Sequence, residues 1–422
     1  MTPPSLPPLE VLRDFPGRSI GQWRWDGPTL YAELEREPLV HADGDTHDYS
    51  LHFVMGLRNT GDSVVLAKAT VSRDEGNELS HSNGRIYASD RPDQEFVLAT
   101  EAALTDHQGS IEWTVEMGPG ETRYWSNTMW RPLSVVTNLF GRLADEAGLT
   151  AEVLGESIQG RPIVAYYDLI AARDQTRPTV LITSGLHPVE ADTIGTEAIL
   201  EWLIEDGRWA LGRFNIVLVP VANPDSFVET RNGCNAAGVN FFWDFRADDP
   251  KLCPEAFHLW RFIKRMPPVV YIDFHSYSVQ GSRKLPGPYR KPELLHWDRA
   301  TRELASDMFQ SLNEIPGTRP QSLFAPSTLA YRITREMNTI TIAKYHLHQD
   351  QGKAQMKRMS VNVVERLLNI LKESRVSGTS ILAKPYGPIA RTPLTRAVQA
   401  AYRARYLYPK RVRKALSGIT GT

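Results

Sequence analysis

The sequence predicts an α/β protein in which an antiparallel β-sandwich precedes a larger, mostly parallel α/β domain. Between residues 22 and 130, short runs of alternating apolar and polar residues are separated by turn residues, without a helical stretch. This pattern is typical of a small β-sandwich. After residue 133, strand patterns alternate with helical ones, which favours a mostly parallel sheet covered on both faces. We expect domains over residues 1–133 and 134–374, and a basic tail over 375–422.

In the first domain, apolar alternation predicts strands over residues 51–57 and 64–71. The residues between them read Arg-Asn-Thr-Gly-Asp, which is turn chemistry, so we expect these two strands to pair as a hairpin. Residues 95–99 and 111–115 continue the same pattern and predict two further strands.

In the second domain, four buried-type strands are expected over residues 179–184, 214–220, 269–274 and 339–345. Helical patterns cover residues 191–204, 254–264, 299–313 and 359–372, and the second of these begins with proline, which the first turn of a helix tolerates. Sheets of this kind bind their ligands at the carboxyl ends of the strands. The site is therefore expected where these strands end.

Composition excludes several classes of protein. The 422 residues carry a net charge of −1, so no global field points to nucleic acid, and we expect no DNA partner. Two cysteines cannot form a disulfide framework and fit a reducing compartment. No apolar run is long enough to span a membrane, and the first residues lack the regions of a signal peptide. We expect a cytoplasmic globular enzyme.

The balanced total hides a basic C-terminal tail. Residues 374–422 contain ten lysines and arginines and no acid, which leaves −11 on the first 373 residues. Several interpretations stay open: the tail binds an acidic partner, RNA or an anionic membrane surface, or it folds back on the acidic remainder or packs on a second subunit.

Histidines and carboxylates follow two of the predicted strands. His187 and Glu190 lie directly after the strand over 179–184, and His275 ends the strand over 269–274. Catalytic zinc takes imidazole and carboxylate ligands, usually three from the protein, so these residues are candidate metal ligands. Asp273 lies two residues before His275 on the same side of its strand and is a candidate for orienting a ligand.

Arg231 follows a third strand end, after the Asn-Pro-Asp turn at residues 223–225. One interpretation is that its guanidinium stabilises an oxyanion that develops on a substrate carbonyl. The other is an ordinary surface ion pair.

Together these segments resemble the zinc carboxypeptidase superfamily typified by carboxypeptidase A. The resemblance covers roughly residues 120–372 and rests on His187 to Glu190, Asn223 to Asp225 with Arg231, Asp273 to His275, and a hairpin-like segment over 155–163. A β-rich domain in front is similar to the cytosolic carboxypeptidase branch. The resemblance implies a mixed-sheet catalytic domain, Zn²⁺ held by His187, Glu190 and His275, and Arg231 polarising the scissile carbonyl.

The chain departs from the family where the substrate is bound. The family usually reads Gly-Val-Asp-Leu-Asn-Arg-Asn-Phe, and its Asn-Arg pair clamps the terminal carboxylate of the substrate. Here residues 238–245 place Phe242 and Trp243 at that pair and Asn240 at the aspartate that supports the metal site. An indole has one donor and no charge, so it cannot replace a bidentate arginine. The aromatic run either lines an apolar pocket or is buried packing.

The general base is the second departure. The family has a glutamate where Ala343 stands in the simplest frame. Glu336, just before that strand, is a candidate substitute; its alternative is a solvated charge beside Arg332 and Arg335. His346 and His348 are either further candidates or a surface pair at the strand end.

The function predicted from these features is zinc-dependent hydrolysis of an amide bond in a peptide or acyl-amino small molecule without an ordinary free C-terminus. Arg231 and Glu336 are its candidate catalytic residues. Two alternatives stay open: a catalytically impaired relative that keeps zinc for binding, and a zinc enzyme that runs a non-hydrolytic step of a biosynthetic pathway.

Overall fold

The computed structural model describes residues 6–35, 37, 52–72, 84–104, 110–173, 177–229, 231–277, 285–287, 299–315, 318–320, 328–337 and 339–374. The basic tail over 375–422 lies outside the described residues, so what we expect of it stays a prediction. Within the described ranges, no helix is long and apolar enough to cross a membrane.

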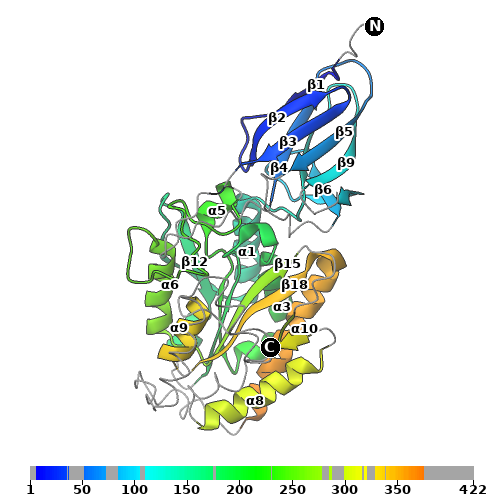
Figure 1. Ribbon diagram of the computed structural model, residues 1–422. Coiled ribbons are helices and arrows are strands. Elements are labelled where there is room, and N and C mark those ends of the chain that lie inside the picture. The colour runs from blue at the N-terminus through cyan, green and yellow to red at the C-terminus, as the bar shows by residue number, and fades with distance from the viewer. Residues whose placement is uncertain are drawn as a thin grey trace, which may run out of the picture.

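The N-terminal domain is a sandwich of two five-stranded sheets, as predicted (Figure 1). The first sheet has the order β1 (Leu9–Val11), β4 (Val54–Asn59), β10 (Thr122–Ser126), β6 (Arg85–Ser89) and β7 (Val97–Glu101). The second has the order β2 (Ile20–Asp26), β3 (Thr29–Leu34), β5 (Val65–Ser72), β9 (Ser110–Met117) and β8 (Ala103–Leu104). The strand pairs are antiparallel except β3 and β5, which run parallel.

The hairpin predicted over residues 51–71 is wrong. β4 pairs with β1 and β10 in the first sheet, whereas β5 pairs with β3 and β9 in the second, so the turn between them crosses from one sheet to the other. The buried amide of Asn59 secures this crossing by donating to the carbonyls of Ser63 and Gly118, both at 2.8 Å. Alternation predicts which face of a strand is buried but does not name its partner strand.

The second domain is built on a six-stranded mixed sheet, which confirms the fold that the resemblance implies. Its order is β11 (Thr150–Glu156), β12 (Pro162–Tyr167), β14 (Asn215–Val219), β13 (Thr179–Thr183), β15 (Val270–Tyr277) and β18 (Ile340–His348). β14, β13, β15 and β18 are parallel, and β11 and β12 add an antiparallel edge. The two central strands β13 and β14 are mostly apolar and every residue in them is buried, because both faces of this part of the sheet are covered.

Helices cover the two faces of this sheet. One apolar core contains side chains of α1 (Leu133–Ala147), α3 (Thr193–Glu205), α8 (Arg299–Asn313) and α10 (Lys353–Glu373). The other contains side chains of α6 (Pro254–Arg265) and α9 (Leu329–Glu336). The shorter elements are α2 (Leu169–Arg173), α4 (Arg208–Leu211), α5 (Pro224–Glu229), β16 (Leu285–Gly287), β17 (Thr318–Pro320) and the 3₁₀ turns η1 (Pro188–Glu190) and η2 (Gln349–Gln351).

The two domains share a continuous core at their boundary. Tyr87 and Trp130 belong to the same apolar cluster as α1 and α3. Arg131, 2% exposed, pairs with Glu197 of α3 at 2.7 Å, and Lys353 of α10 pairs with Glu95 ahead of β7. In Figure 1 the sandwich accordingly lies against the end of the second domain that carries α5, α1 and the start of α10. The expected boundary at residue 133 coincides with the first residue of α1.

Candidate metal centre

Two parallel strands bring the predicted ligands together. Thr183, the last residue of β13, lies opposite Asp273 of β15, so the segments that follow these positions emerge side by side at the carboxyl edge of the sheet. His187 and Glu190 lie on the turn after β13, and His275 lies two residues beyond Asp273. Residues 85 positions apart therefore meet through sheet register.

The three side chains form one buried cluster. Nδ1 of His187 lies 2.8 Å from Oε1 of Glu190, and Nδ1 of His275 lies 3.1 Å from Oε2 of the same carboxylate. The three candidate ligand atoms all lie within 4.8 Å of one another. The side chains are at most 5% exposed. Two imidazoles and one carboxylate are the donor set that catalytic zinc takes, so the residues fit this metal.

The far side of each imidazole has its own acceptor. Nε2 of His275 lies 2.9 Å from Oδ2 of Asp273, and Nε2 of His187 lies 3.3 Å from Oδ1 of Asn240. A proton on Nε2 that is donated to these oxygens leaves the Nδ1 lone pair directed at the shared space beside Glu190. Metal-binding histidines are commonly held in this way by their second nitrogen.

The charges of the cluster favour a cation. Burial acts to raise the pKa of Glu190, but His187 and His275 outweigh it and hold that pKa well below its usual range. Burial acts to lower the pKa of His275, but Asp273 and Glu190 outweigh it and raise the pKa to about 10. Glu190 and Asp273 thus stabilise a positive charge at His275, which is carried by a proton in the metal-free protein and would be supplied instead by a metal ion bound at Nδ1.

Asp192 is a buried carboxylate that the sequence analysis did not single out. Its Oδ2 accepts a hydrogen bond from the backbone N–H of Gly185 at 2.9 Å, while Oδ1 has no partner among the described residues. Burial, reinforced by Glu190 and Asp273 and opposed by His275, raises the pKa of Asp192 well above its usual range. Nothing in the sequence marked it, because Asp192 lies inside the helical pattern expected over 191–204, and in the structure its side chain makes no capping hydrogen bond to α3.

Phe242 packs directly on both histidines. Its ring centroid lies 4.8 Å from that of His275 and 5.6 Å from that of His187, in edge-to-face contacts, and the side chain is 1% exposed. Trp243 meets Phe242 at 4.9 Å and is partly buried. Phe241 and Phe245 belong to the apolar core on the α6 side of the sheet. Most of the aromatic run is therefore packing, and Phe242 also forms a wall of the metal centre.

Arg231 lies on the loop that touches His187. A side chain at Gly233, two residues further on, would come within 2.2 Å of the imidazole, so the backbone of this loop lies directly against it. The guanidinium is engaged: Nε pairs with Glu229 at 2.7 Å, and Nη1 donates to the carbonyl of Asn235 at 3.1 Å. The structure therefore shows Arg231 in an ion pair with Glu229, which was one of its two predicted roles. Its other role, toward a substrate carbonyl, stays a proposal.

The structure does not bring Glu336 to this cluster. Glu336 ends α9, is 47% exposed and pairs with Arg332 at 3.0 Å. Ile340, four residues later, lies opposite Val270, at the start of β15, whereas His275 is five residues further along that strand. At about 3.3 Å per residue, Val270 and His275 are about 17 Å apart along β15. Glu336 precedes β18, whereas the metal cluster lies beside the carboxyl end of that strand.

The C-terminal half of β18 does reach the metal centre. The backbone of His346 lies opposite His275, and that of His348 lies opposite Tyr277. The side chains of Ala343, His346 and His348 lie outside the described set, so their roles stay predictions.

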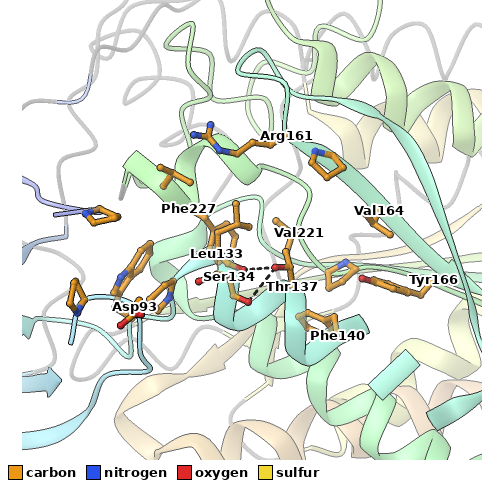
Figure 2. Close-up of a pocket in the computed structure, with 17 residues that line it drawn as sticks. Asp93, Leu133, Ser134, Thr137, Phe140, Arg161, Val164, Tyr166, Val221 and Phe227 are labelled. Atoms are coloured by element: carbon orange, nitrogen blue, oxygen red, sulfur yellow. Dashed lines mark hydrogen bonds between the residues drawn. The ribbon is translucent and has the colours of Figure 1, made fainter. Parts of the chain in front are cut away.

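A separate cavity of about 530 Å³ lies where the sandwich meets α1. Trp130, Phe140, Tyr166 and other largely apolar residues line it, and no residue of the metal cluster does (Figure 2). Its two charged lining residues are already paired, Arg161 with Asp225 and Asp93 with Arg91. The cavity is thus an apolar space between the domains, distinct from the metal centre.

Comparison with known proteins agrees with this geometry. The model of the zinc carboxypeptidase family matches residues 143–351, so the chain contains a zinc carboxypeptidase domain. This family uses Zn²⁺, and its match spans all three clustered residues.

One curated relative is a metallocarboxypeptidase A-like protein from Trichophyton verrucosum, 25% identical over 208 residues that cover 39% of this chain and 47% of the relative. The chain thus matches about half the length of that relative.

Solved structures share the fold over both domains. A metallo-carboxypeptidase from Burkholderia cenocepacia aligns with a TM-score of 0.69 at 16% identity, over 86% of this chain and 99% of that one. A metallo-carboxypeptidase from Pseudomonas aeruginosa, solved with (2-guanidinoethylmercapto)succinic acid, aligns with a TM-score of 0.67 at 16% identity, over 87% and 100% of the two chains. At such identities the likeness concerns the fold alone.

Proposed function

We propose that the chain binds one zinc ion through His187, Glu190 and His275 and hydrolyses an amide bond. The observation that carries this proposal is the convergence of two imidazole Nδ1 atoms on one buried carboxylate, with an acceptor behind each ring. A zinc site needs ligands in the correct orientation and partners that hold them there, and Asp273 and Asn240 are such partners for the two imidazoles.

The residues around the cluster have distinct tasks in this proposal. Zinc, when bound, supplies a Lewis acid that polarises a carbonyl and makes water a better nucleophile. Asp273 and Asn240 hold the two imidazoles in orientation. Arg231 reaches the substrate carbonyl from the loop beside His187 and stabilises the negative charge that develops on its oxygen. That task requires Arg231 to share its guanidinium with Glu229.

The substrate we propose is a peptide or acyl-amino compound whose end is not a free carboxylate. Phe242 and Trp243 stand at the family's carboxylate clamp, and Phe242 is fully packed on the two histidines. Of these two side chains only the Trp243 indole has a donor and neither carries a charge, so a buried carboxylate here would have no cationic partner, which is costly. An amidated, capped or otherwise neutral end fits these two side chains better.

A matched pair of substrates tests the proposal. N-acylated dipeptides that differ only in a free or an amidated C-terminus are offered to the zinc-loaded protein, with Glu190→Gln as the metal-deficient control. We expect kcat/KM for the amidated form to equal or exceed that for the free acid, and the control to be inactive. A strong preference for the free acid would contradict the substrate proposal.

A second candidate is a protein that binds zinc without hydrolysis. The position of Glu336 favours it, because that carboxylate ends α9, is 47% exposed and is paired with Arg332. Stoichiometric zinc without turnover of either substrate would support this candidate or a non-hydrolytic biosynthetic reaction. Membership of the cytosolic branch, a cytoplasmic location and a contact of the basic tail with a second subunit or an acidic partner stay predictions.

A further inference from the structure

The peptide that follows the central carboxylate is conformationally strained. Glu190 ends the 3₁₀ turn η1, and Ala191 after it has φ of 53°, the only positive φ of a non-glycine residue among those the structure describes. Left-handed backbone is unfavourable for a residue with a Cβ, so surrounding contacts must hold it. Any loosening here would move the Glu190 carboxylate away from the two histidines.

Two side chains hold this peptide by its carbonyl. The Ser276 hydroxyl and Nε2 of Gln349 both donate to the backbone oxygen of Glu190, the latter at 2.8 Å. The backbone N–H of Ser276 also donates to Oε2 of Glu190 at 2.9 Å. The backbone and the side chain of Glu190 are therefore fixed from the same strand end, with Gln349 as the second support.

Gln349 is bonded at both ends of its amide. Nε2 also donates to the Ser276 hydroxyl at 2.8 Å, and Oε1 accepts from the backbone N–H of Met129 at 3.3 Å. The side chain is 1% exposed. Rotating the amide by half a turn would place its oxygen against the Glu190 carbonyl, so these partners define its orientation.

Met129 lies on the segment that joins the last strand of the sandwich, β10, to α1. A single buried side chain thus spans from this interdomain segment to the backbone of a predicted metal ligand. Gln349 itself lies in η2, immediately after β18, and does not contact the three clustered side chains through any hydrogen bond described above.

We propose that Gln349 is a positioning residue that holds Glu190 in its zinc-binding conformation and ties the metal centre to the β-sandwich domain. This inference rests on the proposed zinc site and adds a residue that no metal-binding pattern would select. It follows that zinc affinity depends on the interdomain contact at Met129 as well as on the ligands themselves.

The test measures zinc affinity by competition with a chelator, together with the visible absorption spectrum of the Co²⁺-substituted protein. We expect Gln349→Leu to weaken zinc binding by about 10–100-fold, the usual effect of losing a supporting partner, and to alter the cobalt spectrum. Lys353→Met is the matched control: it breaks the interdomain ion pair with Glu95 but touches no part of Glu190, so both readouts should stay as in the wild type.

Two further variants separate positioning from folding. Gln349→Glu keeps the size of the side chain and the acceptor for Met129 but loses the donor to Glu190, and should also weaken zinc binding. Ala191→Gly, added to Gln349→Leu, removes the backbone strain and should recover part of the lost affinity.

Wild-type affinity and an unchanged cobalt spectrum in both Gln349 variants would overturn the inference while leaving the zinc site intact. Failure of the wild-type protein itself to bind zinc would instead overturn the proposed function.

Discussion

The metal cluster and the aromatic segment over 240–245 lie against each other but have diverged to different degrees. The cluster keeps two histidines, a carboxylate and an acceptor behind each ring, all buried and mutually bonded. The neighbouring segment has Phe242 and Trp243 where the family resemblance implies a polar clamp. In the function we propose, the metal ligands therefore match those that the resemblance implies, while the segment beside them presents apolar groups to the substrate.

The difference has a physical cause. A buried ligand set cannot lose one member without leaving the others unpaired in a low-dielectric environment, so it changes as a unit or not at all. A clamp at the edge of a substrate pocket can be replaced by rings that pack on existing side chains, as Phe242 does on the two histidines. Zinc binding and substrate choice should therefore respond separately to substitution.

The largest effect on zinc affinity is expected for His275→Ala. Structural zinc sites bind with about 10–16 kcal/mol shared among four ligands, so losing one ligand should weaken binding by about 10²–10³-fold. Chelator competition measures this. His258→Ala, which removes a partly exposed histidine of α6, is the control and should bind zinc like the wild type. Equal affinities in the two variants would place the metal elsewhere.

Phe242→Ala should separate stability from metal binding. Removal of a fully buried phenylalanine costs about 3–5 kcal/mol of unfolding free energy, measured by urea denaturation of the metal-free protein. Zinc affinity should change far less than in His275→Ala, because both imidazoles keep their acceptors. Phe245→Ala, in the same core, provides the matched loss of stability. Abolished zinc binding in Phe242→Ala alone would show that the ring supports the ligands.

Asn240→Leu tests whether the aromatic segment also supports the metal centre, because Asn240 belongs to this segment but contacts His187. Loss of its oxygen behind His187 should weaken zinc binding by about 10–100-fold. Asn240→Asp keeps that oxygen and should bind zinc at least as tightly as the wild type. If Asn240→Leu retained full affinity, the 3.3 Å contact would have no role in orienting the ring.

The smallest effect concerns His52, far from the metal in the sequence and buried in the sandwich domain. Burial lowers the pKa of His52 to about 3, against 6.5 when unfolded, despite an opposing side-chain hydrogen bond with Asn127. Between these values the unfolded chain binds more protons, so unfolding free energy should fall as pH drops from 6.5 toward 3, by about 2 kcal/mol at pH 5.

His52→Gln should remove this part of the acid sensitivity in urea titrations at pH 7 and pH 5. His258→Gln, whose histidine is less buried, should remove much less. A wild-type pH profile that matches that of His52→Gln would contradict a neutral, buried His52.

The sequence predicts the parallel core well because its strands and helices are long and strongly patterned. Helix α8 begins and ends where the periodicity predicts, and α3 and α6 do so within two residues. The pairing of β4 and β5 could not be predicted, since alternation does not encode the partner strand. Helix α1 was not singled out, although its burial joins the two domains.

The metal cluster was predictable because its residues stand at strand ends and in a family-like order. Asp273 was expected to support it and contacts His275, whereas Asn240, expected only as a departure from the family's aspartate, also contacts a histidine, His187. Gln349 was not expected, because its role depends on contacts with residues 129, 190 and 276, which lie far apart in the sequence. The position of Glu336 could not be predicted, because it depends on the register of β18 on β15, which puts Ile340 opposite Val270 at the start of that strand.

Zinc content, combined with X-ray absorption at the zinc edge of the purified wild-type protein, tests the proposed metal centre most directly. We expect one zinc ion per chain, with two imidazoles and oxygen ligands in its first coordination shell. A protein that binds no zinc after incubation with the metal, or a shell without imidazole, would contradict the assignment of His187, Glu190 and His275.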